Sequence, residues 1–263
     1  MTRPAQIELN DGRQRIGIQI LYEDRSVIAV DKPAGWMLVP FSWQRTNRNL
    51  QAAITSSIAA RDFWARSRGV KFLRHVHRLD AETTGILLLA KSSGAVDTYG
   101  DLFESRRMEK TYLAVVHGLP GQNHWSCRLK LASDPAQIGR MKVDQRLGKE
   151  SETEFRLLEA RGDTALLEAK PHTGRTHQIR VHLRESGHPV VGDELYGPKA
   201  KGRAVRPIKQ PREFPLGLRA VELAYINPFT GRRVLIKAPT DEFLRTFNFT
   251  AVRSGDAVGS DQV

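Results

Sequence analysis

Short apolar stretches separated by turn residues run along most of the chain and predict more strands than helices. Two stretches, 27–30 and 85–91, are apolar at consecutive positions, which is typical of strands covered on both faces. Gly162-Asp163 and the sequence Asn-Pro-Phe-Thr-Gly at 227–231 each predict a hairpin between the strands that flank them. The remaining predicted strands are 111–117, 153–159, 164–169, 218–224 and 233–237.

Apolar residues recur at helical spacing in only a few places, and these lie irregularly between the strands. The predicted helices are 50–58 after the capping residue Asn49, 96–103, 176–183 with Thr176 as its cap, and 241–247. A strand-rich chain without regular strand–helix alternation disfavours a doubly wound parallel sheet. The pattern therefore predicts a mixed α+β fold built on antiparallel strand pairs.

The two ends of the chain differ from its middle. Residues 1–15 are polar and are predicted to be loosely held, and 251–263, rich in Ser, Gly and Asp, predicts a disordered tail. Between them, 16–250 shows no break in composition and no internal repeat, so we expect one catalytic domain. Within it, the segment 199–215 is rich in Lys, Arg and Pro and is predicted to be a long surface loop.

The charge balance changes this picture from a plain globular domain to one with an anionic partner. The 263 residues include 41 Lys and Arg against 29 Asp and Glu, a formal net charge of +12. With 40% hydrophobic residues the chain can bury a core, so the charge belongs to a folded surface that suits a polyanion such as RNA. A membrane surface is the weaker alternative, because neither end carries a basic amphipathic helix or a dense cationic run.

Several classes of protein are excluded by residues that are missing. The single cysteine, Cys127, excludes an internal disulfide framework and a multi-cysteine zinc site and fits a reducing cytosol. The sequence has no phosphate-binding loop, dinucleotide fingerprint or Gly-x-Ser-x-Gly motif, so we expect no cofactor. We expect no metal at the clusters His75/His77 and His172/His177/His182, because neither has a helical i, i+4 ligand pair backed by an acid and basic neighbours would repel a cation. A cytoplasmic location is expected, since no signal peptide or membrane-spanning stretch is present.

Three segments carry candidate chemistry. Asp80 directly precedes a core strand and has cationic neighbours that favour its ionised form, although a structural ion pair or a turn would also explain it. The segment 170–184 holds four cations and no acid, so an Arg there could pair with a carboxylate, while a generic basic surface is the alternative. Tyr112 shares a strand face with Ala114 and Val116 and is more commonly a core residue at such a place.

Taken together and in this order, the segments resemble the RluA-type family of RNA pseudouridine synthases. The resemblance covers about 20–247 and rests on the following pieces: Ile20-Leu21-Tyr22-Glu23-Asp24, Val30-Asp31-Lys32-Pro33-Ala34-Gly35, His77-Arg78-Leu79-Asp80 with Thr83 and Gly85, Lys110-Thr111-Tyr112, Gly174-Arg175-Thr176-His177-Gln178-Ile179-Arg180-Val181-His182-Leu183 and Gly192-Asp193-Glu194-Leu195-Tyr196-Gly197.

The resemblance implies a bent, mixed sheet with flanking helices and a basic cleft, in which a uridine of ribosomal or transfer RNA is flipped out and isomerised. It implies that Asp80 is the catalytic aspartate and that Arg180 pairs with it. Tyr112 would pack on the uracil and is a candidate base for the C5 proton. Arg78 would fill the gap left in the RNA. The residues expected to bind RNA are His77, Arg78, Lys110, Arg175, His177 and Gln178.

The resemblance also implies an enzyme that needs no metal and has RNA as its partner. We expect a monomer, and we expect no separate N-terminal RNA-binding domain, because only about 20 residues precede the first strand shared with the family. Thr84, Val39, Arg219 and Asn227 depart from residues common in the family, and 41–48 and 199–212 are candidates for choosing the RNA. Two alternatives stay open: a non-catalytic RNA-binding module on the same fold, and a hydrolase using Asp80 and Glu82. The net charge of +12 disfavours the hydrolase, whose glycan substrate would be neutral.

Overall fold

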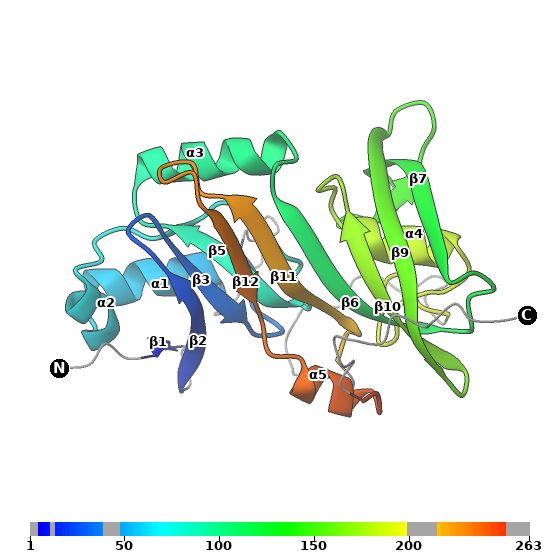
Figure 1. The fold of residues 1–263 in the computed structure, drawn as a ribbon, viewed down its shortest axis with the longest axis horizontal. Helices are drawn as coiled ribbons and strands as arrows, with labels where there is room; N and C mark the ends of the chain where they lie inside the picture. The colour runs from blue at the N-terminus through cyan, green and yellow to red at the C-terminus, as the bar shows by residue number, and fades with distance from the viewer. Residues whose placement is uncertain (1–4, 11–13, 39–47, 199–214, 251–263) are drawn as a thin grey trace, which may run out of the picture.

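The computed structural model describes residues 5–10, 14–38, 48–198 and 215–250. Twelve strands of this part of the chain form one continuous sheet (Figure 1). Its order is β1-β2-β3-β5-β11-β6-β10-β9-β7-β8, with β12 paired to β11 and β4 to β5. The bounds are β1 Gln6–Asn10, β2 Arg15–Glu23, β3 Val27–Lys32, β4 Arg74–His75, β5 Thr84–Ala90, β6 Glu109–His117, β7 His124–Ser133, β8 Met141–Val143, β9 Lys149–Arg161, β10 Thr164–Pro171, β11 Leu218–Ile226 and β12 Arg233–Lys237.

The sheet is mixed but largely antiparallel, as the sequence predicts. Among the strand pairs of the described residues only β5 and β11 run parallel, and they meet over two residue pairs, Thr84 with Arg219 and Gly85 with Ala220. Gly85 has a φ of +104° there, and an added Cβ would lie 2.0 Å from the Ala220 carbonyl oxygen. Only glycine therefore allows this junction between the two halves of the sheet.

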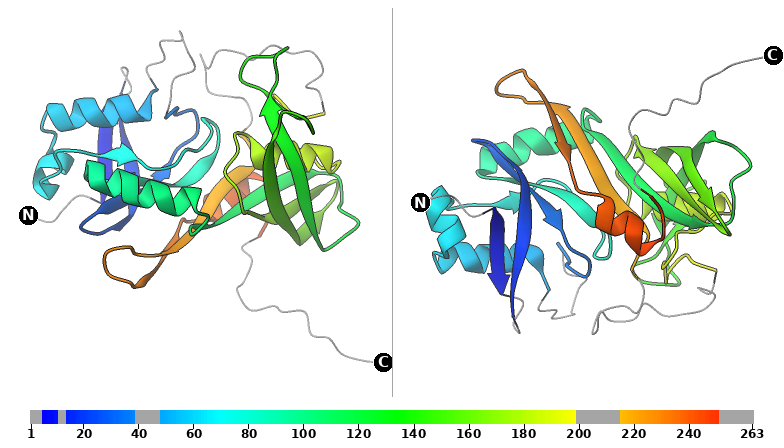
Figure 2. Two further views of the ribbon diagram at one scale, coloured as in Figure 1. Left: turned by 90° about the horizontal axis from the view of Figure 1, so that it is seen from above. Right: turned by 60° about the horizontal axis from the view of Figure 1, so that its bottom comes forward.

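The described residues form five helices, and four of them, α1 to α4, cover the two halves separately (Figure 2). α1 (Leu50–Ala59), α2 (Phe63–Arg68) and α3 (Ser93–Glu104) pack with β1 to β5 over one apolar core. α4 (Gln178–Glu185) covers the other half, where Ile179 and Leu183 pack on β6, β9 and β10. α5 (Asp241–Thr246) closes a third cluster beneath β6 and β11. The junction between the halves is where the candidate residues gather.

Helix starts only partly follow the sequence expectation. Asn49 caps α1 as predicted, because its Oδ1 accepts a hydrogen bond from the Ala52 backbone N–H at 3.0 Å. The prediction of Thr176 as the cap of α4 is wrong: the cap position is His177, in a left-handed conformation with φ +54°. The amide side chain of Gln178 closes this turn instead, since its Oε1 accepts from the Arg175 N–H at 3.0 Å.

The N-terminal expectation also differs from the structure. Within 1–15, predicted to be loosely held, Gln6–Asn10 forms β1 along the edge of β2. Its strict alternation puts Ile7 and Leu9, each 1% exposed, into the core beside α1 and α2. The predicted loop at 199–215, apart from Pro215, and the predicted tail at 251–263 lie outside the described residues. Within the described residues, no helix combines the length and apolar character that crossing a bilayer requires.

Candidate active site

A cavity of ≈ 370 Å³ opens at the junction of the two halves. Three elements bring the candidate catalytic residues to it: Asp80 on the loop between β4 and β5, Tyr112 on β6, and Arg180 on α4. The structure thus gathers around one cavity residues that are up to 100 positions apart. The six residues predicted to bind RNA line the same cavity: His77, Arg78, Lys110, Arg175, His177 and Gln178.

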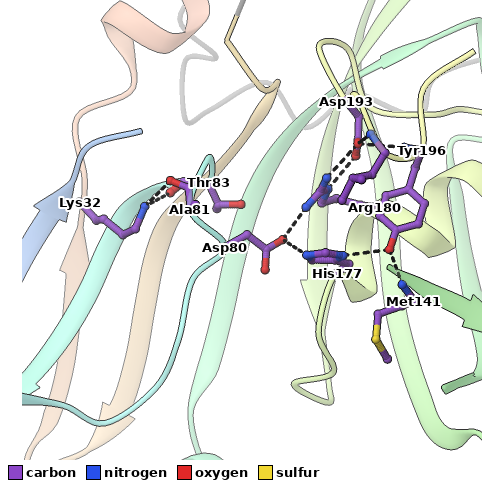
Figure 3. Close-up of polar contacts among 10 residues, drawn as sticks. Lys32, Asp80, Ala81, Thr83, Met141, His177, Arg180, Asp193 and Tyr196 are labelled. Carbon is purple, nitrogen blue, oxygen red and sulfur yellow. Dashed lines mark hydrogen bonds and ion pairs between the residues drawn. The ribbon is translucent and has the colours of Figure 1, made fainter. Parts of the chain in front are cut away.

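A buried lysine donates hydrogen bonds to the backbone of the loop that carries Asp80 (Figure 3). Lys32, 0% exposed, donates from Nζ to the carbonyl oxygens of Pro33 at 3.1 Å, Ala81 at 2.8 Å and Thr83 at 2.9 Å. Burial lowers the pKa of Lys32 to about 7, against the opposing charges of Glu82 and Asp80. Three donated bonds use all three protons of an ammonium group, so this geometry corresponds to the charged form.

Arg180 donates hydrogen bonds to two carboxylates at once. Its Nε and Nη2 donate to Asp193 Oδ2 and Oδ1 at 2.7 and 2.9 Å, and its Nη1 donates to Asp80 Oδ2 at 3.0 Å. Arg180 and Asp193 are only 3% and 6% exposed. Burial opposes the charged form of Arg180, but Asp193 and then Asp80 outweigh it and raise the pKa of the guanidinium. A fixed positive charge is therefore aimed at Asp80.

The pKa of Asp80 is lowered from its usual value even though burial alone would raise it. The groups that lower it are His177, Arg180 and Arg78. His177 is neutral at pH 7, because burial lowers the pKa of its ring to about 4. At that pH the charge and hydrogen bond of Arg180 are the main cause, and Asp80 is ionised.

Tyr112 forms part of the cavity wall between the two cores. It packs beside Ala114 and Val116, the strand face that the alternation predicts. Burial, and then the charge of Asp80, raise the pKa of the Tyr112 hydroxyl. At neutral pH the side chain is therefore a neutral phenol that offers a flat ring and a hydroxyl to whatever occupies the cavity.

Of the six residues predicted to bind RNA, three are cationic side chains at the cavity, two have their side chains hydrogen-bonded within its wall, and His177 lies with Nε2 3.8 Å from Asp80 Oδ2. Arg78 is exposed and Arg175 half-buried at the cavity, with the Arg175 Nε donating to the Glu150 carbonyl oxygen at 3.0 Å. Lys110 donates to the Thr173 carbonyl oxygen at 3.0 Å, and burial lowers its pKa to about 8. These three side chains retain cationic groups at the cavity, so their RNA role stays a prediction.

The polar atoms of His77 and Gln178 already have partners within the protein, and their contact with RNA stays a prediction. The Nε2 of His77 accepts from the Leu88 N–H at 3.0 Å, and its ring stacks on Phe103 at 4.4 Å between centroids. Gln178 is 4% exposed. The partners of its amide are the Arg175 N–H and Thr173 hydroxyl at Oε1, and the Glu152 carbonyl and Thr153 hydroxyl at Nε2. Both residues hold the cavity wall in shape.

Sequence reasoning missed the residues that support the candidate catalytic pair, Asp80 and Arg180. Lys32, Asp193 and Tyr196 lie in segments that carry the family resemblance, but none of them is among the predicted site residues. The available signal was a charged residue at the end of the apolar run 27–30 and another within the short segment 192–197. Among the described residues, no group of three or more His, Cys, Asp or Glu side chains is arranged to hold a metal ion.

Comparison with known proteins identifies the family. The model of the RNA pseudouridylate synthase family matches residues 26–185. The ribosomal large subunit pseudouridine synthase C of Escherichia coli K12 is 33% identical over 232 residues, which cover 86% of this chain and 67% of the relative. The protein of the same name from Buchnera aphidicola of Schizaphis graminum is 30% identical over 240 residues, covering 89% and 70%.

A solved structure agrees on the fold. Human RNA Pseudouridylate Synthase Domain Containing 1 superposes with a TM-score of 0.66 at 24% identity, covering 87% of this chain and 86% of that one. The chain belongs to the RNA pseudouridylate synthase family. It is accordingly an RNA pseudouridine synthase, an isomerase, and the resemblance found in the sequence is confirmed. The alternative of a non-catalytic RNA-binding module is not favoured.

Proposed function

We propose that this protein isomerises a uridine of large-subunit ribosomal RNA to pseudouridine, with Asp80 as the nucleophile. The observation that carries the proposal is the ionised Asp80 carboxylate, paired with the buried Arg180 at 3.0 Å and facing a cavity lined by Tyr112. The choice of ribosomal RNA is supported by the relatives, which are named as ribosomal large subunit enzymes.

The cavity provides what a flipped uridine needs. Its volume of ≈ 370 Å³ is within the range of about 300–1,000 Å³ for small-ligand sites. Extruding a base costs a few kcal/mol. Stacking on the Tyr112 ring would return about 1–3 kcal/mol. Arg78 and Arg175 at the cavity would offset the rest through phosphate contacts.

The reaction rearranges bonds within one nucleotide and needs no outside reactant. Both Arg180 and His177 contact Oδ2 of Asp80, so we assign the attack to Oδ1. Attack at ribose C1′ or at uracil C6 forms a bond to Asp80 Oδ1. The C1′–N1 bond then breaks, the uracil rotates, a C1′–C5 bond forms, and the bond to Oδ1 breaks to return the free carboxylate. The proton lost from C5 balances the proton gained at N1. Arg180 keeps Asp80 ionised and aimed before the attack and pairs with the carboxylate again when it is released.

In this scheme Tyr112 contributes its ring as the surface on which the uracil turns. Its raised pKa disfavours a phenolate before the reaction begins. The hydroxyl could accept the C5 proton only while passing its own proton on, as in concerted transfer. Tyr112→Phe separates these roles, because it keeps the ring and removes the oxygen.

The test is tritium release from RNA labelled at uridine C5, using Asp80→Asn beside the wild-type enzyme. Asparagine is nearly isosteric with aspartate but is not nucleophilic, so we expect unchanged RNA binding and loss of activity by at least about 10⁴-fold. Turnover within a few fold of the wild type would remove Asp80 from the mechanism.

The RNA itself is identified by mapping pseudouridine in cells with and without the gene. Loss of a site in large-subunit ribosomal RNA, restored by the wild-type gene and not by Asp80→Asn, is the expected result. Loss of sites in transfer RNA alone would contradict the proposed substrate while leaving the proposed chemistry intact.

A further inference from the structure

His177 occupies an unusual place between the nucleophile and the supporting shell (Figure 3). It precedes α4 with φ +54°, in the left-handed region that few residues other than glycine adopt, although His does so more often than most. This backbone turns the imidazole inward, where its side chain is 9% exposed. Its Nε2 lies 3.8 Å from Asp80 Oδ2 and its Nδ1 lies 2.9 Å from the Tyr196 hydroxyl.

The hydrogen bonds behind His177 determine which ring nitrogen carries the proton. The Met141 backbone N–H donates to the Tyr196 oxygen at 2.8 Å, and a backbone N–H can only donate. The Tyr196 hydroxyl proton is then free to point at His177 Nδ1. With Nδ1 accepting, a neutral ring carries its proton on Nε2, the atom that faces Asp80. The opposite tautomer would set a nitrogen lone pair against a carboxylate oxygen, which is repulsive.

Tyr196 supports both partners of Asp80. Its hydroxyl orients His177, while its ring lies 5.1 Å from the Arg180 guanidinium carbon, within cation–π range. Asp193, which fixes Arg180, accepts the backbone N–H of Tyr196 at 3.0 Å. The turn from Asp193 to Tyr196 thus orients a charged donor and a neutral donor toward the same oxygen, Oδ2 of Asp80.

We propose that His177 is a positioning residue of the isomerase, a neutral Nε2–H donor that fixes the Asp80 carboxylate, with Tyr196 setting its tautomer. The inference rests on the proposed role of Asp80. The distance of 3.8 Å is longer than a hydrogen bond, and catalytic bonds of this kind often tighten only when substrate is bound. A neutral donor also suits the site, because a second full cation would weaken the nucleophile more than Arg180 alone does.

The first experiment compares Tyr196→Phe with Tyr22→Phe. The first removes the hydroxyl that orients His177 and keeps the ring beneath Arg180. The second removes a hydroxyl bonded to Asp24 at 3.1 Å, away from the cavity. We expect the single-turnover rate of Tyr196→Phe to fall about tenfold with RNA affinity unchanged, and Tyr22→Phe to match the wild type. Equal rates for the two variants would overturn the proposed role of Tyr196.

The second experiment tests the donor itself by chemical rescue of His177→Gly. Glycine accepts φ +54° without strain and leaves room for a ring. At about pH 8, where added imidazole is mostly neutral, imidazole should restore the single-turnover rate, while 1-methylimidazole, which has no N–H, should not. Equal rescue by both compounds, or a wild-type rate without rescue, would show that the ring only fills space. Failure of all rescue in a folded variant also counts against the proposal.

The acid side of the pH profile gives a third readout that packing alone would not move. The charged groups facing His177 are Asp80, Arg180, Asp193 and Arg78. Loss of the neutral donor should raise the pKa of Asp80. As the pH is lowered, the activity of Tyr196→Phe should therefore begin to fall at a higher pH than the activity of the wild type does. Coincident profiles would contradict the inference. An active Asp80→Asn enzyme would instead remove the proposed function.

Discussion

At the scale of single residues, Arg180 is a buried charge that is neutralised by one carboxylate and directed at another. Breaking a buried ion pair by removing one partner typically costs about 3–5 kcal/mol, because the other charge is left unpaired. Arg180 avoids this cost through Asp193, whose carboxylate accepts two of its donors and two backbone N–H groups. The third donor is then directed at Asp80. The planar guanidinium of arginine is essential here, because one cation must donate to two carboxylates in fixed directions.

We therefore expect Arg180→Lys to lower the single-turnover rate by at least about 100-fold with RNA affinity within a few fold of the wild type. Lysine keeps the charge but cannot span Asp193 and Asp80. Arg156→Lys is the matched control, because Arg156 also forks onto one carboxylate, Glu168, at 3.2 and 3.1 Å, on an exposed surface. That variant should lose little in rate or stability. Near-wild-type catalysis by Arg180→Lys would show that charge alone suffices.

The sequence could not reveal these residue-level partners without the fold. Asp80 and Arg180 are paired in advance only through the family resemblance, since 100 positions separate them. The sequence does place Asp193 and Tyr196 in a segment that resembles the family, yet what they contact depends on how α4 meets the loop after it. The RNA role of Gln178 is expected only from the family resemblance, and the sequence does not show that its side chain is buried and that its amide donates to the Glu152 carbonyl oxygen.

At the scale of elements, the junction of β5 and β11 governs where the catalytic loop sits, because Asp80 lies just before β5. Gly85→Ala places a Cβ 2.0 Å from the Ala220 oxygen at φ +104°. We expect a loss of about 2–4 kcal/mol in unfolding free energy, from overpacking and a strained backbone. Gly94→Ala in α3 is the control, because an added Cβ there meets nothing within 4 Å. Chemical denaturation measures both.

In that experiment Gly94→Ala should leave the unfolding free energy unchanged or raise it by up to about 1 kcal/mol. A Gly85→Ala protein as stable as Gly94→Ala would mean that the two strands can move apart without cost. The junction would then not be the rigid support of the Asp80 loop.

Strands and helices with a strong pattern in their own sequence were predictable. Those that form only because they pair with distant strands were not. The buried strands β3 and β5, the helices α1 and α3, and the hairpin between β9 and β10 follow the sequence pattern. β7 and β8 escaped prediction because most of their residues are half-exposed, and pairing makes them strands: β7 pairs with β9, and β8 pairs with β7. β1 escaped for a similar reason, since only two apolar residues mark it.

At the scale of the whole molecule, one sheet unites two bodies that have separate cores. The Asp80 loop belongs to the first core and α4 to the second, while β6, with Tyr112, runs between them (Figure 1). The active site is therefore correct only when both halves are folded and joined. A cavity at such a junction can recruit side chains from distant segments, which explains why no short motif defines it.

Buried neutral histidines make the whole fold sensitive to acid. Burial lowers the pKa of His182 to about 4, where its Nε2 lies 2.8 Å from Ser151 Oγ and its Nδ1 3.0 Å from Thr153 Oγ1. Burial also lowers the pKa of His177 to about 4 and that of His77 to about 3. In the unfolded chain each would titrate near 6.5. Below that pH the unfolded state binds more protons than the folded state. The contribution of these histidines to the unfolding free energy is therefore fully present above pH 6.5 and is lost as the pH falls toward 4.

The prediction is that the unfolding free energy falls steeply between about pH 7.5 and 5.5, by about 1.4 kcal/mol for each such histidine. The carboxylates Asp80 and Asp193, whose pKa values are lowered, titrate below this window and do not contribute. Denaturation of the wild type and of His182→Gln across this range measures the slope. Glutamine can keep the bonds to Ser151 and Thr153 but cannot be protonated, so the variant should be less sensitive to acid by about 1.4 kcal/mol, whatever its stability at pH 7.5. Parallel slopes for the two proteins would show that His182 is protonated as readily in the fold as in the open chain.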